Sequence, residues 1–533
     1  MKSISPIIAT ILLVVMTVAI SGLFYAFISG MFSSLTSSSN NLVNQQSQYT
    51  SFTINNVYCS NNIIYFNIYN NGNIPININN SQIIFTDNNG NTISINGNNI
   101  ICNNGNIIPS GSNSLCYIIN SLCYYSYTDY IKSTNFVYNG ISYSYNIPNS
   151  NNFNLIYNLS NYPIIIYNTQ NIPTPQPFQQ DIAICNGTIN IGNSFAYVNN
   201  ATLFNQIDSN GQNVMFFNPN NGQLFYSWYE GQLNYNGVTC DVWWINIPQG
   251  IPSNSNITVY MYIGSNNSNY YPLIYPYVGT NEQVIGTMQY DNGQDVFIAY
   301  GYFNNTFDGW TGYVIYGSYS PTATPNGIEI INNQISQEGT YILPPNNGNI
   351  PEMPLIVEEA WYYPSSNADA NVIALFGNTN NQVYVVNIGS TDGGHTPASN
   401  LSTFVQFEYW PGNNPPYSQV TMLKSAVTDQ YLNYTSFPTS GGTVYSYLIV
   451  NSSYAQTGYY IYNSNQVWAP LTLLDTYNIN DNGYTYSNLN YNPYQYPTLE
   501  ISAGDCAPSY QYVEWVIARS YPPNGVMPYI YIG

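Results

Sequence analysis

The hydrophobic pattern of this chain changes kind after its first fifty residues. In residues 4–32 almost every side chain is apolar, with small Ser, Thr and Gly interruptions and no charge. A helix of that length can cross about 30 Å of hydrocarbon. Residues 33–48 are rich in Ser, Asn and Gln, and we expect them to continue the helix as a stalk.

Beyond residue 49 the pattern becomes one of short apolar runs in which apolar and polar positions roughly alternate. Residues 51–58, 63–69 and 74–85 are predicted strands. The pairs Asn71-Gly72, Asn89-Gly90, Asn96-Gly97 and Asn139-Gly140 lie between or after such runs, and Asn-Gly favours hairpin turns. Alternation of apolar and polar residues buries one face of a sheet and leaves the other exposed to solvent, so residues 49–170 are expected to form a β-sandwich.

Three prolines at alternate positions in residues 171–180 predict a stiff, extended linker and hence a domain boundary. Further short, aromatic-rich runs follow it. The predicted fold class is mainly β, with an N-terminal transmembrane or filament helix. The predicted domains are a leader at 1–3, the apolar helix and stalk at 4–48, a β-sandwich at 49–170, the linker at 171–180, a small β module at 181–285 and a jelly roll at 286–533.

The N-terminal sequence MKSISPIIATILLV resembles that of archaeal type IV pilins and archaellins. The resemblance implies that a prepilin peptidase cleaves between Ser3 and Ile4, and that the freed helix passes from the membrane into a filament core of identical helices. It also implies a helix followed by a β-sandwich. Bacterial pilins carry Glu where this chain has Ile8, which favours the archaeal branch. A cleaved secretory signal is the competing interpretation, but such signals have shorter apolar stretches.

Two later stretches carry a second resemblance. Residues 241–248 (DVWWINIP), 251–252 (IP) and 257–264 (ITVYMYIG) are similar to a small β module of prokaryotic surface proteins, although the expected Y-Y-G-N is YIGS here. In such proteins a concanavalin-like jelly roll follows and closes on D/E-W-V-x-x-R-x-Y. Residues 514–521 (EWVIARSY) match this closing pattern. We predict structural roles for Glu514, Trp515 and Arg519, with Trp515 and Arg519 on one strand face, Arg519 over the Trp515 indole, and Glu514 on the other face. The alternative is that they line a glycan site.

Charge is scarce and one-sided. Only 5% of the residues are charged, and four basic residues face 24 acidic ones, which gives a net charge of −20. Such a surface excludes nucleic-acid binding by phosphate neutralisation. Residues 1–180 are neutral overall, so the whole negative charge lies beyond them. Polarity comes mainly from Asn, Ser, Thr and Gln, which suits an acidic exterior because amides do not titrate; AT-rich codon usage explains the same composition.

The sequence offers little to a catalytic site. His395 is the only histidine, in a Gly-rich turn, and Glu358 and Glu359 are adjacent, so on a strand they face opposite sides. We therefore expect no enzyme activity and no cofactor. Residues 291–295 and 480–483 carry oxygen ligands that suit either calcium or simple turns. The loop with Tyr409, Trp410 and Asn413 is a candidate glycan-binding site, because aromatic rings stack on sugars and amides bond their hydroxyls; buried aromatic packing is the alternative.

Seven cysteines are compatible with an oxidising exterior. Cys59, Cys102, Cys116 and Cys123 allow three pairings within the sandwich, and Cys185 and Cys240 can join in the next module. Cys506 is left as a buried thiol or an intermolecular link. Sequons at Asn158, Asn186, Asn256 and Asn433 permit N-glycosylation.

These observations predict an extracellular, pilin-like glycoprotein of an archaeal cell surface, held in the membrane or a filament through its N-terminal helix. Its partners would be copies of itself or other pilins, the membrane before assembly, and surface glycans. Adhesion through a displayed glycan-binding domain is the favoured function. The alternative is a solute or glycan capture protein that uses the pilin export route without polymerising; a glycoside hydrolase ranks third.

Overall fold

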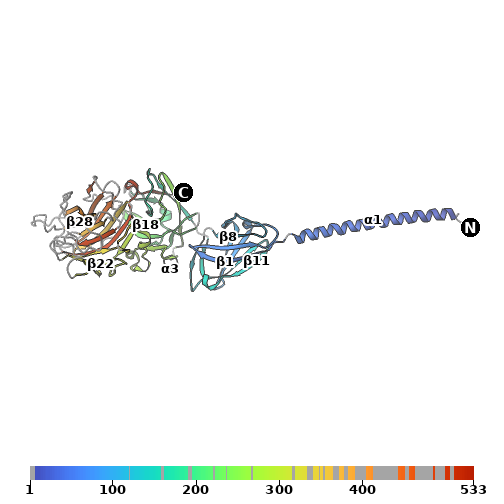
Figure 1. Cartoon of the computed structure of the whole chain (residues 1–533), viewed down its shortest axis with the longest axis horizontal. Helices are drawn as coiled ribbons and strands as arrows, with labels where there is room; N and C mark the ends of the chain where they lie inside the picture. The colour runs from blue at the N-terminus through green and yellow to red at the C-terminus, as the bar shows by residue number, and fades with distance from the viewer. Residues whose placement is uncertain are drawn as a thin grey trace, which may run out of the picture. The chain divides into compact units, whose positions relative to one another are not determined.

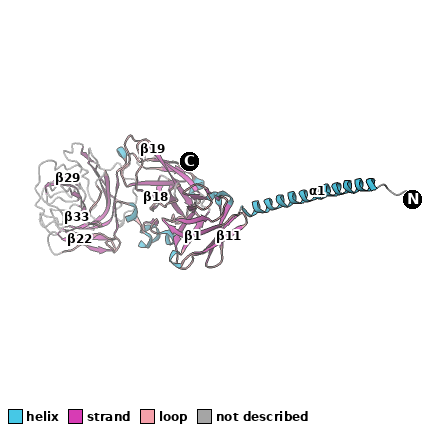
Figure 2. Ribbon diagram, turned by 45° about the vertical axis from the view of Figure 1, so that its right-hand side comes forward, coloured by secondary structure: helices cyan, strands magenta, loops and turns pink. Residues whose placement is uncertain are grey.

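The computed structural model shows a mainly β protein with one long N-terminal helix (Figures 1 and 2), as predicted. The structure describes residues 6–47, 49–118, 121–157, 161–189, 195–219, 222–235, 237–265, 268–314, 319–332, 340–346, 348–351, 354–363, 371–376, 382–389, 404–411, 442–450, 455–461, 484–486, 498–503 and 509–533. The chain forms two compact units, Met1–Asn158 and Leu159–Gly533.

Helix α1 (Pro6–Ser47) is a single helix of 42 residues without a charged residue in its first or last turn. Proline suits a helix start because it lacks the N–H that would have no partner there. Thr10 and Thr17 each donate their hydroxyl to the carbonyl four residues earlier, at 2.6 and 2.7 Å, so these polar groups are satisfied within the apolar segment. The predicted helix and its stalk are confirmed as one element to Ser47.

The first unit continues as a sandwich of short antiparallel strands. Its sheets have the orders β1-β2-β8-β6, β11-β10-β4-β5, β12-β9 and β3-β7. Between them lies a core of Ile and Phe side chains with the four cysteines. The strands are β1 (Phe52–Ser60), β2 (Ile63–Asn70), β3 (Ile76–Asn77), β4 (Ser81–Asp87), β5 (Thr92–Asn96), β6 (Ile100–Cys102), β7 (Ile107–Ile108), β8 (Asn113–Ile118), β9 (Ser121–Tyr125), β10 (Ile131–Tyr138), β11 (Ile141–Asn146) and β12 (Phe153–Tyr157).

The predicted turns are right at two of four places. Asn139-Gly140 joins β10 to β11 with both φ angles positive, as a type I′ hairpin turn requires, and Asn89-Gly90 joins β4 to β5. Gly97 instead begins a short 3-10 helix, where a Cβ would lie 1.7 Å from the carbonyl oxygen of Ile78. The run 74–85, expected as one strand, is divided by a 3-10 turn at Ile78–Asn80.

The predicted linker at 171–180 lies inside the second unit, which corrects the expected boundary. The Thr174 hydroxyl accepts a hydrogen bond from the Ile251 N–H at 2.7 Å, and the Pro177 carbonyl accepts one from the Ser520 hydroxyl at 2.5 Å. The three prolines extend the chain as expected, but tertiary contacts fix it in place. The division between units falls instead after β12, and the expected end of the sandwich at residue 170 belongs to the second unit, just after strand β13.

The second unit contains four main sheets. The outer sheet has the order β16-β19-β13-β35, the module sheet β15-β14-β18-β17-β20, the central sheet β23-β24-β34-β26-β30-β31-β32 with β21 paired to β34, and the fourth sheet β22-β25-β33-β27-β28-β29. The first strands are β13 (Asn161–Asn168), β14 (Phe178–Cys185), β15 (Tyr197–Asn199), β16 (Val214–Phe217), β17 (Ser227–Tyr235), β18 (Val238–Ile247), β19 (Ser255–Ile263), β20 (Val278–Thr280), β21 (Ala299–Tyr302), β22 (Thr311–Val314), β23 (Thr322–Thr324) and β24 (Gly327–Asn332).

The remaining strands are β25 (Thr340–Leu343), β26 (Leu355–Tyr363), β27 (Asn371–Phe376), β28 (Gln382–Gly389), β29 (Phe404–Pro411), β30 (Gly442–Val450), β31 (Ala455–Ile461), β32 (Tyr484–Tyr486), β33 (Thr498–Ala503), β34 (Ser509–Ser520) and β35 (Tyr529–Ile532). Four one-turn helices connect strands of this unit: α2 (Ala201–Phe204), α3 (Tyr271–Ile274), α4 (Glu282–Ile285) and α5 (Gly293–Val296).

The central sheet is buried on both faces. On one face Val357, Trp361 and Val516 share a core with the fourth sheet, which makes the two-sheet sandwich expected of a jelly roll. On the other face Trp515 and Tyr445 share a core with the module and outer sheets. The predicted module and jelly roll therefore form one body. The chain also leaves the jelly roll before residue 533, because β35 returns to pair with β13.

Candidate functional site

The apolar surface of α1 is the most exposed hydrophobic surface that the structure describes. Between Ile7 and Phe32 its large apolar side chains are 48% to 76% exposed. The segment Pro6–Ser34 is long and apolar enough to cross a membrane, and at about 1.5 Å per residue its 29 residues span about 43 Å. Together with three disulfides, this helix indicates a secreted or membrane-associated protein.

The outer sheet carries the second distinctive surface. On its inner face Ile164, Ile166 and Ile530 lie in the core. On its outer face Tyr529 and Tyr531 of the edge strand β35 are 47% and 40% exposed. Tyr529 pairs with Tyr167 of β13, their rings 5.4 Å apart, and lies 5.8 Å from the stacked ring of Tyr531. The three rings, here called the tyrosine row, form a continuous aromatic strip.

A cleft of about 520 Å³, here called cleft A, lies beside the tyrosine row. Asn256 on β19 is directly opposite Tyr167 in the pairing of β13 with β19, so the row leads into the cleft. Amides, a hydroxyl, aromatic rings and aliphatic side chains line it without any charged group. The lining residues are Asn218, Pro219, Phe225, Ile247, Gln249, Gly250, Asn256, Ile257, Thr258 and Tyr260.

A second cleft of about 400 Å³, cleft B, lies at the other end of the row. It includes Tyr529 itself and is again lined by uncharged groups: Thr169, Gln170, Phe195, Ala196, Tyr197, Val526, Met527 and Tyr529. The Gln170 amide oxygen accepts a hydrogen bond from the Asn524 amide at 2.9 Å, and the Tyr197 hydroxyl donates to the Ile189 carbonyl at 2.8 Å. These bonds hold the polar rim of cleft B in place.

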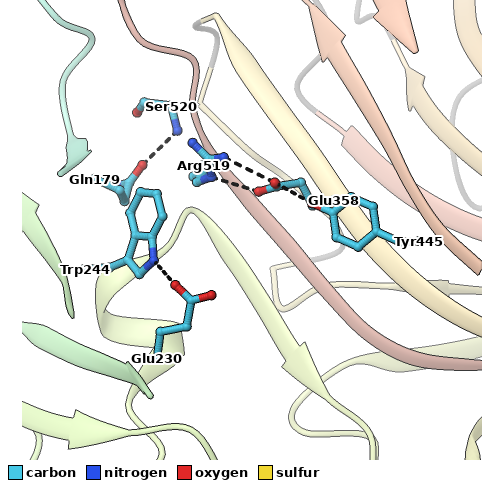
Figure 3. A network of polar contacts seen from close by, with 7 residues as sticks. All are labelled: Gln179, Glu230, Trp244, Glu358, Tyr445, Arg519 and Ser520. Atoms are coloured by element: carbon cyan, nitrogen blue, oxygen red, sulfur yellow. Dashed lines mark hydrogen bonds and ion pairs between the residues drawn. The ribbon is translucent and has the colours of Figure 1, made fainter. Parts of the chain in front are cut away.

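A buried polar network joins the module sheet to the central sheet (Figure 3). Arg519 donates to Glu358 at 2.8 Å from Nε and at 3.2 Å from Nη2, and the Tyr445 hydroxyl donates to the same carboxylate at 2.7 Å. The Ser520 N–H donates to the Gln179 amide oxygen at 2.8 Å. Two hydrogen bonds from a planar guanidinium to one carboxylate are the geometry that best compensates burial of both charges.

The structure corrects the predicted partner of Arg519. Its guanidinium carbon lies 4.7 Å from the ring centre of Trp244, in the predicted β module, whereas we expected it over Trp515. Trp244 is also held by an indole hydrogen bond to Glu230 at 2.9 Å. Trp515 is fully buried and contacts the Tyr445 ring edge-on at 5.5 Å, so a sugar cannot reach it. The sequence could not reveal the contact of Arg519 with Trp244, because the two residues lie far apart in the chain.

Glu514 lies where β34 departs from regular pairing. Trp515 pairs with Ala360 and Val513 with Trp361, so Glu514 is the extra residue of a β-bulge. Its carboxylate is buried and accepts a hydrogen bond from the Thr443 hydroxyl at 3.1 Å. A bulge changes the alternation of faces, which is why the simple two-residue period does not describe this residue.

The buried carboxyl groups of the second unit have raised pKa values. Burial raises the pKa of Asp181 to about 7, although the Ala196 N–H and the charge of Arg519 both lower it. Burial likewise raises the pKa of Asp241 to about 6, against a hydrogen bond from Tyr229. Burial raises the pKa of Glu359 to about 8, with a hydrogen bond from Ser446 opposing the increase. These groups favour the neutral form because a charge in a low dielectric is costly.

In the loop at 291–295, a candidate calcium loop, the Asp291 side chain is bonded to groups of the protein itself. The Asp291 carboxylate accepts hydrogen bonds from the Trp228 indole at 3.0 Å, the Tyr300 hydroxyl at 2.7 Å and the Gly293 N–H at 3.1 Å. Its oxygens face donors, and burial raises its pKa to about 7. These hydrogen bonds give the Asp291 carboxylate a structural role in the turn, which is the other interpretation of this loop, and calcium binding there stays a prediction. Among the described residues no three His, Cys, Asp or Glu side chains gather as a metal site. The second loop, 480–483, lies outside the described residues.

The adjacent Glu358 and Glu359 face opposite sides of β26, as predicted. Glu358 binds Arg519, and Glu359 accepts a hydrogen bond from Ser446 at 2.8 Å. Both side chains are at most 1% exposed, so substrate cannot reach either carboxylate.

The cysteine candidates pair within their predicted modules. The disulfides are Cys59–Cys123, Cys102–Cys116 and Cys185–Cys240. The last two join residues directly opposite each other on neighbouring strands, in β6 with β8 and in β14 with β18. Sequence spacing left three pairings open in the sandwich, because strand register decides among them.

Other predicted residues lie outside the described part of the chain. They are Ser3, Ile4, His395, Asn413 and Cys506, together with the sequon residues Asn158 and Asn433. Tyr409 and Trp410, which we expected in a loop, belong instead to strand β29, which corrects that part of the prediction. Only the backbone of this strand is described, so glycan binding by these two residues stays a prediction.

Sequence reasoning missed the tyrosine row and both clefts. A signal for the row was present in the final residues, Tyr529-Ile530-Tyr531-Ile532, which alternate aromatic and aliphatic as a half-buried strand does. The pairing of this strand with Tyr167 joins residues from opposite ends of the second unit, so the row itself needed the fold.

No protein-family model matches the chain. A relative from Sulfolobus islandicus rod-shaped virus 1, called uncharacterized protein 562, is 27% identical over 391 residues. The match covers 70% of this chain and 59% of the relative, less than two thirds of the relative's length.

Two solved structures are similar over part of the chain. The CBM2 module of the evolved Dit protein of Lactobacillus casei BL23 phage J-1 is 9% identical, with a TM-score of 0.26 over 42% of this chain and 94% of that one. The exoplasmic/lumenal domain of VIP36 in its metal-free form is 7% identical, with a TM-score of 0.25 over 44% of this chain and 93% of that one. At these TM-scores neither structure bears on the function of this chain.

Proposed function

We propose that this chain is an extracellular, pilin-like structural and adhesion protein without enzymatic activity. Its N-terminal helix holds it in a membrane or a filament, and its β units are displayed outside and bind surface glycans. The observation that carries the proposal is the exposed apolar surface of α1, which runs for 29 residues before the disulfide-stapled sandwich begins. Monomeric soluble proteins rarely expose so large an apolar surface.

Two environments can cover this surface, and the chain uses both in our proposal. Lipid covers it first, since the segment exceeds the roughly 20 residues that span a bilayer. Copies of the same helix cover it afterwards. Helix α1 carries apolar side chains on all sides, and an all-round apolar helix suits burial in lipid or in a filament core.

The test is a single charge in the middle of the apolar segment. Val15→Asp should release the protein from the membrane fraction and abolish fibres, because an Asp at the centre of a membrane helix costs about 2.5 to 3.5 kcal/mol. Ser38→Asp, on the same helix beyond Ser34, is the matched control and should leave both unchanged. Sedimentation of membranes and electron microscopy of cell-surface material provide the two readings.

Membrane sedimentation and electron microscopy together distinguish a filament subunit from a membrane-held capture protein. Fibres from the wild-type chain indicate a filament subunit, whereas membrane retention without fibres indicates a capture protein that never polymerises. Unchanged retention and unchanged fibres in Val15→Asp would contradict the proposal.

A further inference from the structure

We infer that the outer face of the outer sheet is a binding site for an uncharged polysaccharide. In this site the sugar chain lies across the tyrosine row and reaches cleft A at one end and cleft B at the other. The inference deepens the proposed function and rests on it, since it names the binding surface and the ligand class of the displayed part.

The tyrosine row is exposed although its sheet already has a core on the other face. The inner face of the same strands supplies the core, so the fold already buries the aliphatic residues it needs. Tyr529 and Tyr531 nevertheless remain 47% and 40% exposed, side by side and stacked. A flat, rigid aromatic surface of this kind offers apolar contact area at low entropic cost and leaves hydroxyls at the edge. The apolar faces of sugar rings fit such a surface.

Polar side chains that suit sugar hydroxyls line both clefts. Cleft A presents the amides of Asn218, Gln249 and Asn256 and the hydroxyl of Thr258. Amides both donate and accept hydrogen bonds, and a hydroxyl does the same, so together they match the mixed donor and acceptor pattern of sugar hydroxyls. Cleft B adds Thr169 and Gln170. A few polar groups set beside aromatic walls are the usual composition of a ligand site.

The tyrosine row and cleft A lie on one continuous sheet face. The outer faces of β35, β13 and β19 are neighbours in one sheet, and Tyr529, Tyr167 and Asn256 occupy the same row of the pairing. Neighbouring strands lie about 4.8 Å apart, so the row spans about 10 Å before the clefts extend it. This length suits a segment of an extended chain rather than one small molecule.

Charge selects the ligand class. Neither cleft is lined by a charged residue, and the whole chain has a formal net charge of −20 at pH 7. Acidic polysaccharides would meet a repulsive field and find no lysine or arginine in the site. Uncharged polysaccharides meet no such repulsion.

One sequon bears on this site. Asn256-Ile257-Thr258 lies on β19 and lines cleft A, so an N-linked glycan at Asn256 would fill the cleft with the protein's own sugar. This occupant is an outcome that the test must separate from a free polysaccharide.

The experiment measures binding of the full chain in detergent to immobilised glucan, mannan, alginate and hyaluronate. We expect binding to glucan or mannan and none to the two acidic polymers. Tyr529→Ala and Tyr531→Ala should each weaken binding about ten-fold, the loss of one stacking contact of about 1.4 kcal/mol. Tyr319→Ala is the matched control, because Tyr319 is 48% exposed in the same unit but lies outside the row and clefts, and it should not change binding.

A conservative variant and a folding control complete the test. Tyr529→Phe retains the ring and should bind nearly as well as the wild-type chain. Melting temperatures of all variants show whether each one folds normally. Binding to no neutral polymer, equal binding to acidic polymers, or a normal affinity in folded Tyr529→Ala would overturn the inference. So would mass spectrometry that finds Asn256 fully glycosylated. Membrane retention, measured in parallel, reports on α1 alone, so failure of the site and failure of the anchor give different results.

Discussion

The two units of this chain place their charges in opposite ways. In the first unit Lys132 and Asp129 are exposed, and Asp87 is half-buried, while the core contains apolar side chains and two disulfides. Among the described residues of the second unit, seven carboxyl side chains and one guanidinium are at most 4% exposed. They are Asp181, Glu230, Asp241, Glu358, Glu359, Glu500, Glu514 and Arg519.

This difference shows that a chain with few charges can still bury them. The first unit is stabilised by a small core and covalent links, which do not respond to pH. The second unit buries carboxyl groups with raised pKa values, so its stability depends on their protonation. The contrast accords with an acidic exterior, where carboxyl groups are neutral and their burial costs little.

The largest expected effect is that of pH on the second unit. Burial raises the pKa values of Asp181 and Asp291 from 3.8 to about 7 and that of Glu359 from 4.5 to about 8. A carboxyl with a raised pKa contributes stability that is full below its unfolded value and is lost as pH rises through its folded value. A pKa difference of one between the folded and unfolded states corresponds to about 1.4 kcal/mol, so raising the pH from 4 to 8 should lower the free energy of unfolding by an amount on the order of 10 kcal/mol for these three groups together.

Calorimetry at pH 4, 6 and 8 checks this prediction. The transition of the second unit should move to lower temperature as pH rises, while that of the first unit stays in place. Asp87 does not disturb the comparison, because its hydrogen bond from Asn91 lowers its pKa and places its titration below this range. Glu359→Gln should flatten the response, and two transitions that shift together would break the contrast.

The next effect tests the buried ion pair. Arg519→Met leaves the Glu358 carboxylate buried without its guanidinium partner, which should destabilise the second unit by about 3 to 5 kcal/mol. Lys132→Met removes an exposed cation from the first unit and should change stability by less than about 0.5 kcal/mol. Chemical denaturation of both variants gives the comparison. Replacing Arg519 and Glu358 together by Met should recover most of the loss, and no recovery would mean that the network does more than neutralise the pair.

The smallest expected effect is the loss of one of the two disulfides of the first unit, Cys59–Cys123. Replacing Cys59 and Cys123 by Ser opens a link across 64 residues and should cost about 2 to 4 kcal/mol. Only the first transition should move in a thermal scan. The double replacement of Cys185 and Cys240 is the matched control, because that link lies in the second unit and should move only the second transition.

The sequence was sufficient where local patterns decide the structure. A long apolar run with only small Ser, Thr and Gly interruptions predicted α1, and alternation with Asn-Gly turns predicted the hairpin of β10 and β11. The closing motif placed Arg519 and Trp515 on a buried strand, which the structure confirms.

The sequence was insufficient where distant segments meet. The prolines of 171–180 predict an extended backbone whether that backbone is free or packed, so a boundary inferred from them was wrong. The partner of Arg519 and the tyrosine row both join residues far apart in the chain. Local composition has no information about such pairings, because any of the many aromatic residues of this chain could have filled either place.

The start of the mature chain tests the central claim most directly, namely that α1 is kept as the anchoring and assembly element. Mass spectrometry of the N-terminal peptide of protein purified from cell-surface material gives this residue. Our account predicts a mature chain that begins at Ile4, with the whole apolar segment retained. A mature chain that begins near residue 30 would show that the segment is a discarded secretory signal and would contradict the account.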